Sequence, residues 1–389
     1  MYSGKTVFTQ IMDFLPMYEF HKCVNRYQGN QRIRTFSCAD QFLCMAFAQL
    51  TFRESLRDIE ACLRSMSTKL YHMGLRGRIS RSTLAKANEN RNWRIYADFA
   101  QILMKIAKDL YASEEFLVDL NQVAYALDST MIDLCLSIFP WALWYGPHGA
   151  IKLHTALALK GNIPLSAKLT NATVNDFEFL DDIVPEPGAF YIMDRGFIDL
   201  SRLFSLHQNS GFFVIREKSR INWRRLYSSP VDKSAGLRSD QIVLFSGRYS
   251  AKDYPEKLRR IRFFDSKNNR YFVFLTNNFV LPAMTITQLY QCRWQVEIFF
   301  KWIKQHLRIK AFFGTSENAV KTQIWIAMTV YVLMAIVKKR LNIQLNLYTF
   351  LQILSVTIFE KIDISRLGID DAYINNIAIN RNQLELFNF

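Results

Sequence analysis

The sequence has few of the residues that build disulfide frames, zinc sites or low-complexity linkers. Its 389 residues include 6 cysteines, 6 histidines, 14 glycines and 9 prolines. The cysteines form no CxxC pair and have no histidine spacing that would match a zinc site. We therefore expect reduced thiols in the core of a cytoplasmic protein. No internal repeat and no low-complexity segment is visible.

Long hydrophobic runs are also missing. The most apolar segment, 324–337, has fourteen residues, which is too short to span a bilayer and suits a buried helix. The first ten residues, MYSGKTVFTQ, lack the long apolar segment of a signal peptide. These absences argue against a membrane protein.

Acidic residues are scarce relative to basic ones. Lys and Arg number 49 and Asp and Glu 34, for a formal net charge of +15, while half of all residues are hydrophobic. The hydrophobic fraction predicts a folded chain, and the length allows two or three domains. A basic excess of this size favours polyanionic partners, nucleic acid above all. Charge alone does not choose between DNA, RNA and an anionic membrane.

Residues 1–115 are predicted to form an all-helical, basic N-terminal domain. A predicted helix from Ser55 and a Gly-containing break, MGLRGRIS, precede a second helix that opens with polar and basic residues. This order is typical of a helix-turn-helix, although many helical hairpins share it and plain helix packing is the alternative. The candidate contacts to DNA ends are Arg81, Ser82, Lys86 and Arg91.

From residue 116 onward, apolar strands alternate with helices. Strands are predicted at 123–127, 152–159, 164–169, 189–193, 211–215 and 271–275, with short helices at 175–183 and 198–207 and a long helix at 316–340 buried against the sheet. This order predicts a mixed α/β layer fold. The predicted domains after the N-terminal one are a core of 116–216 and 271–345, a basic β-rich insertion of 217–270 and a C-terminal helical tail of 346–389.

Two carboxylates stand at the ends of predicted strands. Asp128 follows the strand at 123–127, and Asp194 follows the strand at 189–193. Carboxylates at the ends of neighbouring strands converge on one edge of a sheet, and a buried aspartate is costly unless it is paired or binds a cation. A turn-forming aspartate is the alternative for either one alone. Together with Glu297, the two could form a three-carboxylate site.

The stretch 290–304, YQCRWQVEIFFKWIK, is predicted to be one helix with a buried stripe. Five polar side chains follow one another along it at separations of three, four, four and three: Tyr290, Arg293, Glu297, Lys301 and Lys304. Those separations place the five on or near one face. An acid among cations suits a place where phosphate and a divalent metal are held together. The alternative is a solvated face of Glu–Lys pairs.

The order Tyr-x2-Arg-x3-Glu-x6-Lys in this stretch matches the YREK signature of bacterial insertion-sequence transposases of the DDE class. With Asp128 in DST and Asp194 in DRGF, the sequence resembles that family over essentially its whole length. The segments GAIKLH, EPGAFYIMDRGF and FLTNN are similar to the family as well. The loop at 144–148 departs from it, because relatives are more basic there, which leaves a DNA role for this loop open.

The resemblance implies an RNase H-like catalytic core with a β-rich insertion, preceded by an all-helical N-terminal DNA-binding domain. It also implies two Mg²⁺ ions, for which Mn²⁺ can substitute, held by Asp128, Asp194 and Glu297, with Asp128 bridging the two ions. In such a site one ion activates water or a 3′-hydroxyl and the other stabilises the leaving oxygen. Carboxylate oxygens are the hard ligands that Mg²⁺ prefers.

The resemblance further implies how the DNA is held. The implied phosphate-binding residues are Tyr290, Arg293, Lys301 and Lys304. Members of the family can cut the second strand through a DNA hairpin, which requires a base to leave the stack and to rest on an aromatic side chain. The candidates for base stacking are Trp294, Tyr271 and Phe272, and a role as a core aromatic is the alternative for each.

The implied function is that of a DNA transposase that binds the terminal inverted repeats of its insertion sequence, cleaves the ends and joins the 3′ ends to target DNA. Its partners would be double-stranded DNA and a second copy of the chain on the paired ends, in the bacterial cytoplasm on the nucleoid. Three alternatives stay open: an RNase H-like nuclease without strand transfer, a catalytically silent DNA-binding derivative, and an RNA-binding protein. The repeat sequence, the target preference and the excision route do not follow from the sequence.

Overall fold

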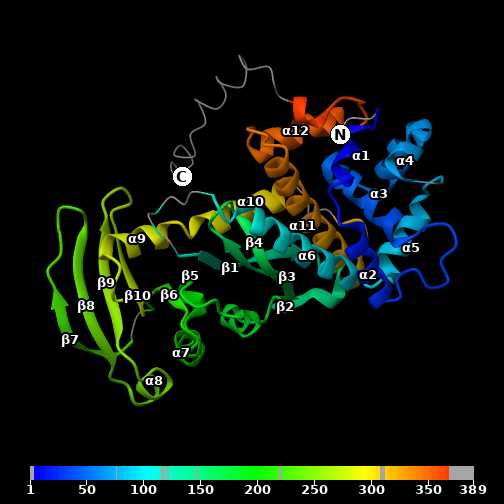
Figure 1. Ribbon diagram of the computed structural model, residues 1–389. Coiled ribbons are helices and arrows are strands. Elements are labelled where there is room, and N and C mark those ends of the chain that lie inside the picture. The colour runs from blue at the N-terminus through cyan, green and yellow to red at the C-terminus, as the bar shows by residue number, and fades with distance from the viewer. Residues whose placement is uncertain are drawn as a thin grey trace. The chain divides into compact units, whose positions relative to one another are not determined.

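The computed structural model describes residues 4–75, 77–114, 118, 120, 122–145, 148–218, 221–306 and 312–367 (Figure 1). These residues form two compact units. A sheet unit comprises Met104–Lys304, and a helical unit comprises the described residues of Met1–Leu103 and Gln305–Phe389. The units are divided after Leu103 and Lys304, so the predicted boundaries at 115, 216, 270 and 345 stay a prediction about functional domains.

The helical unit is built from short helices around one long one. Its elements are α1 Val7–Met12, α2 Met17–Arg26, α3 Cys38–Leu50, α4 Leu56–Ser65, η1 Ser67–Lys69, η2 Tyr71–Met73, α5 Arg81–Asn90, the start of α6 Arg94–Tyr111, α11 Glu317–Arg340, α12 Leu347–Thr357 and η6 Ile364–Arg366. Several of these helices begin at a serine whose hydroxyl accepts the backbone N–H three residues later, as at Ser37, Ser55 and Ser316. This is the usual N-cap, and it explains where these helices start.

The long helix α11 is the centre of the helical unit. It packs against α1, α3, α5 and α12, and the side chains from Ile324 to Val337 are buried without a break. Among the described residues it is the one helix long and apolar enough to cross a membrane, yet 94% of its most apolar window is buried inside the protein. The predicted helix and its burial are confirmed, but in the part of the chain that the structure describes its packing partners are helices and not the sheet, contrary to the prediction. Its 24 residues show that burial, and not the length of the apolar run, is the argument against a membrane span.

The sheet unit is a single ten-stranded sheet with helices against it. The strands are β1 Ala124–Leu134, β2 Leu143–Tyr145, β3 His148–Ala158, β4 Ile163–Asn171, β5 Phe190–Met193, β6 Phe212–Arg216, β7 Trp223–Ser229, β8 Leu237–Phe245, β9 Leu258–Asp265 and β10 Arg270–Thr276. The helices are η3 Pro140–Ala142, η4 Asp176–Asp182, η5 Arg195–Phe197, α7 Leu200–Gln208, α8 Arg248–Asp253, α9 Ala283–Gln291, α10 Trp294–His306 and the end of α6.

The order of the strands identifies the core. The sheet runs β2-β3-β1-β5-β6-β10-β9-β8-β7, and β4 pairs with β3. Strand β3 is antiparallel to both β1 and β4, whereas β5 and β6 run parallel to β1. The five strands β4-β3-β1-β5-β6 therefore have the RNase H-like arrangement, and the predicted fold class is confirmed.

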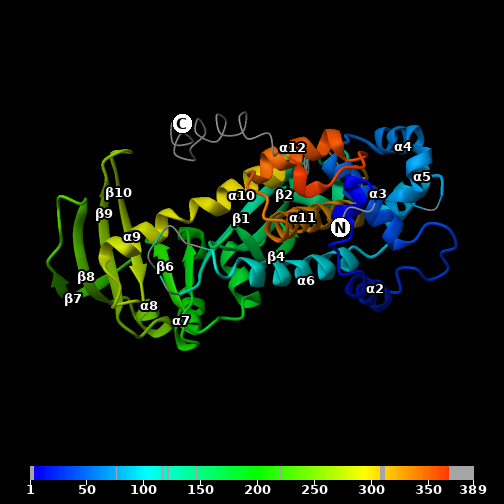
Figure 2. The same cartoon turned by 45° about the horizontal axis from the view of Figure 1, so that its top comes forward.

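The predicted β-rich insertion continues the same sheet. Strand β10 pairs with β6 on one side and with β9 on the other, and β8 and β7 follow, all antiparallel (Figure 1). Helix α9 packs against β5, β6 and β8 (Figure 2). The chain therefore passes from the insertion directly back to the central strands that carry the candidate site.

Buried aromatic and aliphatic side chains hold the central strands in place. The strand β5, with the sequence FYIM, is buried along its whole length, as expected for a parallel strand that is covered on both faces. Tyr125, Tyr191 and Phe213 belong to one buried cluster with side chains of α7. The turn between β3 and β4 is the predicted hairpin, with positive φ at Gly161 and Asn162.

Two predicted segments are described only in part. The tail predicted at 346–389 contains α12 and η6 up to Leu367, and residues 368–389 lie outside the described residues. Residues 146 and 147 of the loop at 144–148 also lie outside them.

Candidate active site

Strand register brings the two predicted aspartates together. The parallel pairing of β1 with β5 ends at Leu127 opposite Met193, so Asp128 and Asp194 are the next residues on two neighbouring strands, which lie about 4.8 Å apart in a sheet. Asp128 does not end its strand, contrary to the prediction. Strand β1 continues to Leu134 because its pairing with β3 persists, and Asp128 faces Thr155 across that pair.

Each aspartate is oriented by a backbone N–H group that follows it closely. The N–H of Ser129 donates to Oδ1 of Asp128 at 2.8 Å. The N–H of Gly196 donates to Oδ1 of Asp194 at 2.7 Å, at the start of η5. Hydrogen bonds from backbone N–H groups favour the charged form of a carboxylate and fix its direction. Both carboxylates are therefore held before any ligand binds.

Arg293 connects β1 to the helix that carries the third carboxylate. Its Nη1 donates to Oδ2 of Asp128 at 2.7 Å, and its Nη2 donates to Oε1 of Glu297 at 2.5 Å. The side chains of Arg293 and Asp128 are 11% and 18% exposed, whereas Glu297 is 36% exposed. The arginine thus closes the inner part of the site and leaves the glutamate facing outward.

The predicted single helix at 290–304 is two helices. Helix α9 ends at Gln291 and α10 begins at Trp294. The N–H of Arg293 donates to the carbonyl of Tyr290, and the N–H of Val296 donates to that of Arg293. These are i→i−3 bonds of the 3₁₀ type, which tighten the turn without breaking the path of the chain. The signature therefore lies across a junction, with Arg293 at the junction itself.

Burial and like charges raise the pKa of Asp128 to about 7. Burial is the largest cause. The Arg293 guanidinium and the Ser129 N–H act in the opposite direction, and the charges of Asp194 and Glu297 raise the pKa further. Burial acts to lower the pKa of Arg293, but Asp128, Tyr290 and Glu297 together raise it above its usual value. The site concentrates negative charge where water is largely excluded.

Tyr290 lies beneath Arg293 and is not an open phosphate contact. It is 6% exposed, its ring packs against Phe274 with centroids 4.6 Å apart, and the Arg293 guanidinium lies 5.7 Å from that ring. Burial raises the pKa of Tyr290. Tyr290 therefore supports Arg293 in this structure. Lys301 is exposed and Lys304 is half-buried, one and two turns beyond Glu297 on α10.

The three candidates for base stacking differ in access. Trp294 is 54% exposed next to Arg293. Tyr271 and Phe272 project to opposite faces of β10 because side chains alternate along a strand. Tyr271 is 50% exposed and lies under the guanidinium of Arg262. The ring centroids of Phe272 and Tyr290 are 6.5 Å apart, and the guanidinium groups of Arg216 and Arg270 lie over the Phe272 ring. Trp294 is thus the most exposed of the three, and it directly follows Arg293 in the chain.

The candidate end contacts are divided between surface and interior. Arg81, Ser82 and Lys86 are exposed on α5. Arg91 is 8% exposed, and its guanidinium donates to the carbonyls of Phe36 and Ser37 and to Gln41. The donors of Arg91 fasten α3 inside the helical unit, and its burial argues against the predicted contact with DNA, which stays a prediction.

The connection between the two helices of the predicted helix-turn-helix is longer than that motif allows. Helices α4 and α5 pack against each other, but residues 66–80 separate them and include η1 and η2. A helix-turn-helix has a turn of about three or four residues. This pair is therefore a helical hairpin with an inserted loop, and contact of α5 with DNA stays a prediction.

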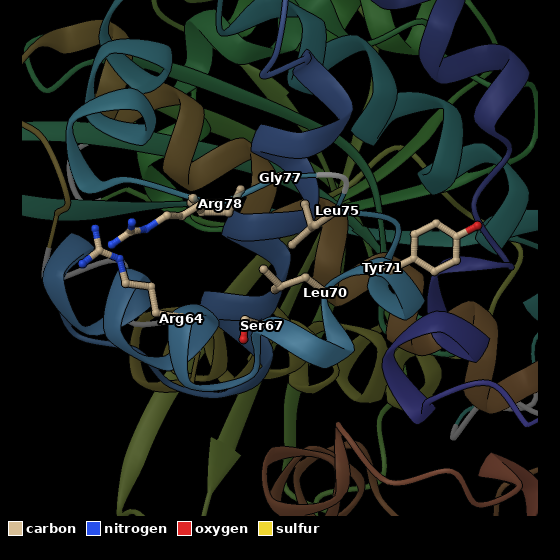
Figure 3. A pocket seen from close by; sticks show the side chains of 8 residues that line it. Arg64, Ser67, Leu70, Tyr71, Leu75, Gly77 and Arg78 are labelled. Atoms are coloured by element: carbon tan, nitrogen blue, oxygen red, sulfur yellow. The ribbon is translucent and has the colours of Figure 1, made fainter.

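The inserted loop lines a hollow of about 470 Å³ with basic side chains at one end (Figure 3). The lining residues are Arg64, Ser67, Leu70, Tyr71, Leu75, Gly77, Arg78 and Ile79. Arg64 and Arg78 lie at one end and Tyr71 at the other (Figure 3). Arg64 is partly neutralised by Glu60, at 2.6 Å. None of these residues is a candidate from the sequence.

The carboxylates suit a divalent metal by type, but they are not arranged as a metal centre. In the part of the chain that the structure describes, no group of three or more His, Cys, Asp or Glu side chains could hold a metal ion. Arg293 explains this, since its guanidinium binds Asp128 and Glu297 at once. The three acids offer the hard oxygens that Mg²⁺ prefers. An ion shared by all three requires Arg293 to release them.

A polar cluster of Asp176, Ser129 and Lys152, next to the site, was not predicted from the sequence. Asp176 accepts hydrogen bonds from Ser129 at 2.6 Å and from Lys152 at 3.1 Å. The sequence marked Asp176 only as the start of a helix, and the contact with Ser129 joins residues 47 apart in the chain. The available signal was the serine after Asp128 in DST.

Comparison with known proteins identifies the two parts of the chain. A family model described as "Transposase DDE domain" matches residues 120–333, and a model described as "Domain of unknown function (DUF4372)" matches residues 3–76. The solved structure of a piggyBac transposase synaptic complex with hairpin DNA covers 96% of this chain and 83% of its own at 11% identity. Its TM-score of 0.46 is too low to support an inference.

Three curated relatives are named as transposases. The protein y4zB of Sinorhizobium fredii is 31% identical over 243 residues, which are 61% of this chain and 67% of that protein. The transposase named for insertion sequence element IS5377 of Geobacillus stearothermophilus is 29% identical over 58% of this chain and 60% of its own length. The one named for element IS4SA of Synechocystis is 24% identical over 69% and 75%.

The two aspartates, Arg293 and Glu297 all lie within the segment that the transposase model matches, and that segment is more than half of the chain. Membership of this family implies the use of a divalent metal. The protein therefore belongs to the DDE transposase family.

Proposed function

We propose that this transposase cleaves and joins DNA at a Mg²⁺ site formed by Asp128, Asp194 and Glu297. The observation that carries the proposal is the pair of hydrogen bonds from Arg293, which bring a carboxylate of β1 and a carboxylate of α10 to one guanidinium. Asp194 adds a third negative charge, since its field raises the pKa of Asp128. Three acids around one inner cation leave negative charge that divalent ions can neutralise.

Bound Mg²⁺ would supply Lewis-acid activation of the attacking hydroxyl and of the leaving oxygen. The chain's own residues provide the rest. Ser129 and Gly196 hold the two strand aspartates through their N–H groups. Once released from the carboxylates, Arg293 could donate both of its Nη groups to a phosphate, whose oxygens match the fork of a guanidinium.

The DNA would extend from this site over basic side chains. Lys301 and Lys304 follow Glu297 on α10 and could bind phosphates of the transposon end, and the open ring of Trp294 could receive an extruded base. Recognition of the terminal inverted repeats would involve the exposed Arg81, Ser82 and Lys86. We further propose that two copies act on the paired ends, in the bacterial cytoplasm on the nucleoid.

The test is cleavage of duplex DNA that carries the ends of the element, in Mg²⁺, by the wild type and by Asp128→Ala. We expect nicking at the ends by the wild type and none by the variant. Asp133→Ala is the matched control, because Asp133 is an exposed aspartate on the same strand, and it should cleave like the wild type. Binding to the ends should be similar for all three proteins.

Two outcomes would favour the alternatives. End binding without cleavage by the wild type would support a catalytically silent DNA-binding protein. Cleavage without a strand-transfer product, when a target duplex is supplied together with pre-cleaved ends, would support a nuclease that does not join DNA.

A further inference from the structure

The two N–H groups that orient the aspartates belong to residues that both lie against one side chain, Asp176. Ser129 holds Asp128 and Gly196 holds Asp194. Oδ1 of Asp176 accepts from the Ser129 hydroxyl at 2.6 Å. Oδ2 of Asp176 lies 3.1 Å from the position that a Cβ on Gly196 would occupy. One carboxylate therefore binds Ser129 and leaves no room for a side chain at Gly196, the two residues that orient the aspartates.

Asp176 is itself held firmly. Lys152 of β3 donates to its Oδ1 at 3.1 Å and to the carbonyl of Val174 at 2.6 Å, and the Lys152 side chain is only 12% exposed. The start of η4 is fixed by a capping box between Asn175 and Glu178. A charge-assisted contact with little exposure is stronger than a surface pair. Asp176 is therefore a fixed point and not a mobile surface acid.

The position of Asp176 lets it act without occupying the site. Successive side chains of a strand project to opposite faces, so Ser129 presents its hydroxyl on the face opposite to that of Asp128. Asp176 contacts the strand on the Ser129 face, whereas Arg293 contacts Asp128 on the other. The hydrogen bonds from Asp176 to Asp128 run through Ser129, whose hydroxyl binds Asp176 and whose N–H binds Asp128.

We propose that Asp176 is a positioning residue that keeps the carboxylates of Asp128 and Asp194 in one fixed relation, through Ser129 and Gly196. The proposal rests on the proposed function, because the two carboxylates matter only if they act together. Gly196 contributes by its lack of a side chain, since a Cβ there would lie 2.9 Å from Oδ1 of Asp194 and 3.1 Å from Oδ2 of Asp176.

The first experiment compares Asp176→Ala with Asp182→Ala. Asp182 ends the same short helix and pairs with Lys168 at 2.5 Å on the neighbouring strand, so it matches Asp176 in type and partner but lies away from Ser129. We expect kcat for end cleavage to fall roughly 10–100-fold in Asp176→Ala, as for losses of residues that orient metal ligands. KM for the DNA ends should stay close to that of Asp182→Ala. The Tm should fall further than in Asp182→Ala, because the largely buried Lys152 loses its partner, so kcat is compared per folded molecule.

A second readout does not depend on turnover. Mn²⁺ binding, followed by the electron paramagnetic resonance of free Mn²⁺, should be several-fold weaker in Asp176→Ala than in Asp182→Ala. Equal kcat and equal Mn²⁺ binding in the two variants would overturn the proposal while leaving the proposed function intact. A wild type that neither cleaves nor binds Mn²⁺ would overturn both, whereas Mn²⁺ binding without cleavage would remove only the proposed function.

Further variants test the route through Ser129. Asp176→Asn keeps an oxygen that can accept from the hydroxyl, so it should retain more activity than Asp176→Ala. Ser129→Ala removes the same hydrogen bond and leaves its N–H in place. The double variant Asp176→Ala/Ser129→Ala should lose little beyond Asp176→Ala alone. Fully additive losses would show that Asp176 does not act through Ser129.

Discussion

Two arginines of the sheet unit whose side chains have little exposure, Arg259 and Arg293, have opposite surroundings. Arg259, on β9, makes a bidentate pair with Asp240 at 2.9 and 2.7 Å and donates its remaining Nη1 to the carbonyl of Leu281. Both side chains of that pair are 10% exposed. Arg293 instead joins Asp128 and Glu297, which come from different elements.

The difference lies in the balance of charge. In the insertion one guanidinium pairs with one carboxylate, so the charges of Arg259 and Asp240 neutralise each other and no further ion is needed. In the candidate site one guanidinium serves two carboxylates with Asp194 close by, and the pKa of Asp128 is raised to about 7 by burial and by its acidic neighbours. A site with an excess of negative charge can bind a cation. A charge-balanced pair such as Arg259 and Asp240 contributes only to the stability of the fold.

The largest effect should follow from Glu297→Gln. The substitution keeps the size of the side chain and removes one negative ligand, so end cleavage should fall about a thousandfold or more, equivalent to the loss of several kcal/mol of charge stabilisation. A gel assay of end cleavage, with binding measured in parallel, is the check. Glu256→Gln changes an exposed glutamate of the insertion and should have no effect. An equal collapse of binding would make Glu297 structural.

Asp240→Asn should lower stability and leave the cleavage rate intact, the opposite of what is expected for Glu297→Gln. It leaves the Arg259 guanidinium buried without its counter-charge, which typically costs about 3–5 kcal/mol of folding free energy. The midpoint of urea unfolding should therefore fall markedly, while the folded fraction keeps its cleavage rate. Asp253→Asn, at an exposed position on α8, is the control. A change in activity per folded molecule with unchanged stability would contradict the comparison.

Arg293→Met tests the competition between the guanidinium and a metal. Without the arginine, Asp128 and Glu297 lose their partner, so the variant should be less stable in EDTA. Mn²⁺ should then raise its Tm more than that of the wild type. Ligand at a hundred times its Kd stabilises by about 2.7 kcal/mol. Arg262→Met, an exposed arginine of β9, should respond to Mn²⁺ like the wild type, and an equal response of Arg293→Met would refute the competition.

The smallest effect concerns His154, which lies opposite Ser129 on β3. Burial, mainly, lowers the pKa of His154 to about 4. Because the folded pKa lies below the unfolded value of about 6.5, the stability from neutral His154 is complete above pH 6.5 and is lost as the pH falls toward 4. The loss should reach roughly 3 kcal/mol at pH 4, and none of it is present near neutral pH. The midpoint of urea unfolding should change less with pH between 6.5 and 4 in His154→Gln than in the wild type. An equal change with pH in both proteins would show that His154 does not cause the loss of stability.

Local pattern was sufficient for the type of each central element but not for its limits. The apolar run FYIM predicts β5 because a parallel strand buried on both faces has no polar alternation. The end of β1 was missed because the residues after Asp128 are half-buried and extended only by their pairing with β3. The junction at Arg293 was missed because no proline or glycine marks it.

Contacts between distant segments were beyond the reach of the sequence. Nothing near Arg91 indicates that its donors are used by carbonyls of Phe36 and Ser37. In the same way, Asp176 has the appearance of an ordinary helix cap until η4 is placed beside Ser129. Charge and spacing predict which side chains could act, whereas burial decides which of them are free to do so.

The sequence by itself determined the chemical types of the site and one of its distances. Arg293 and Glu297 are four residues apart, a separation at which helical side chains meet, and they do meet although Arg293 directly precedes the first residue of α10. Only the tertiary structure decided that Asp128 also binds Arg293 and that Asp194 lies next to Asp128. The parallel register of β1 and β5 sets that contact, and the register depends on buried side chains packed from many parts of the chain.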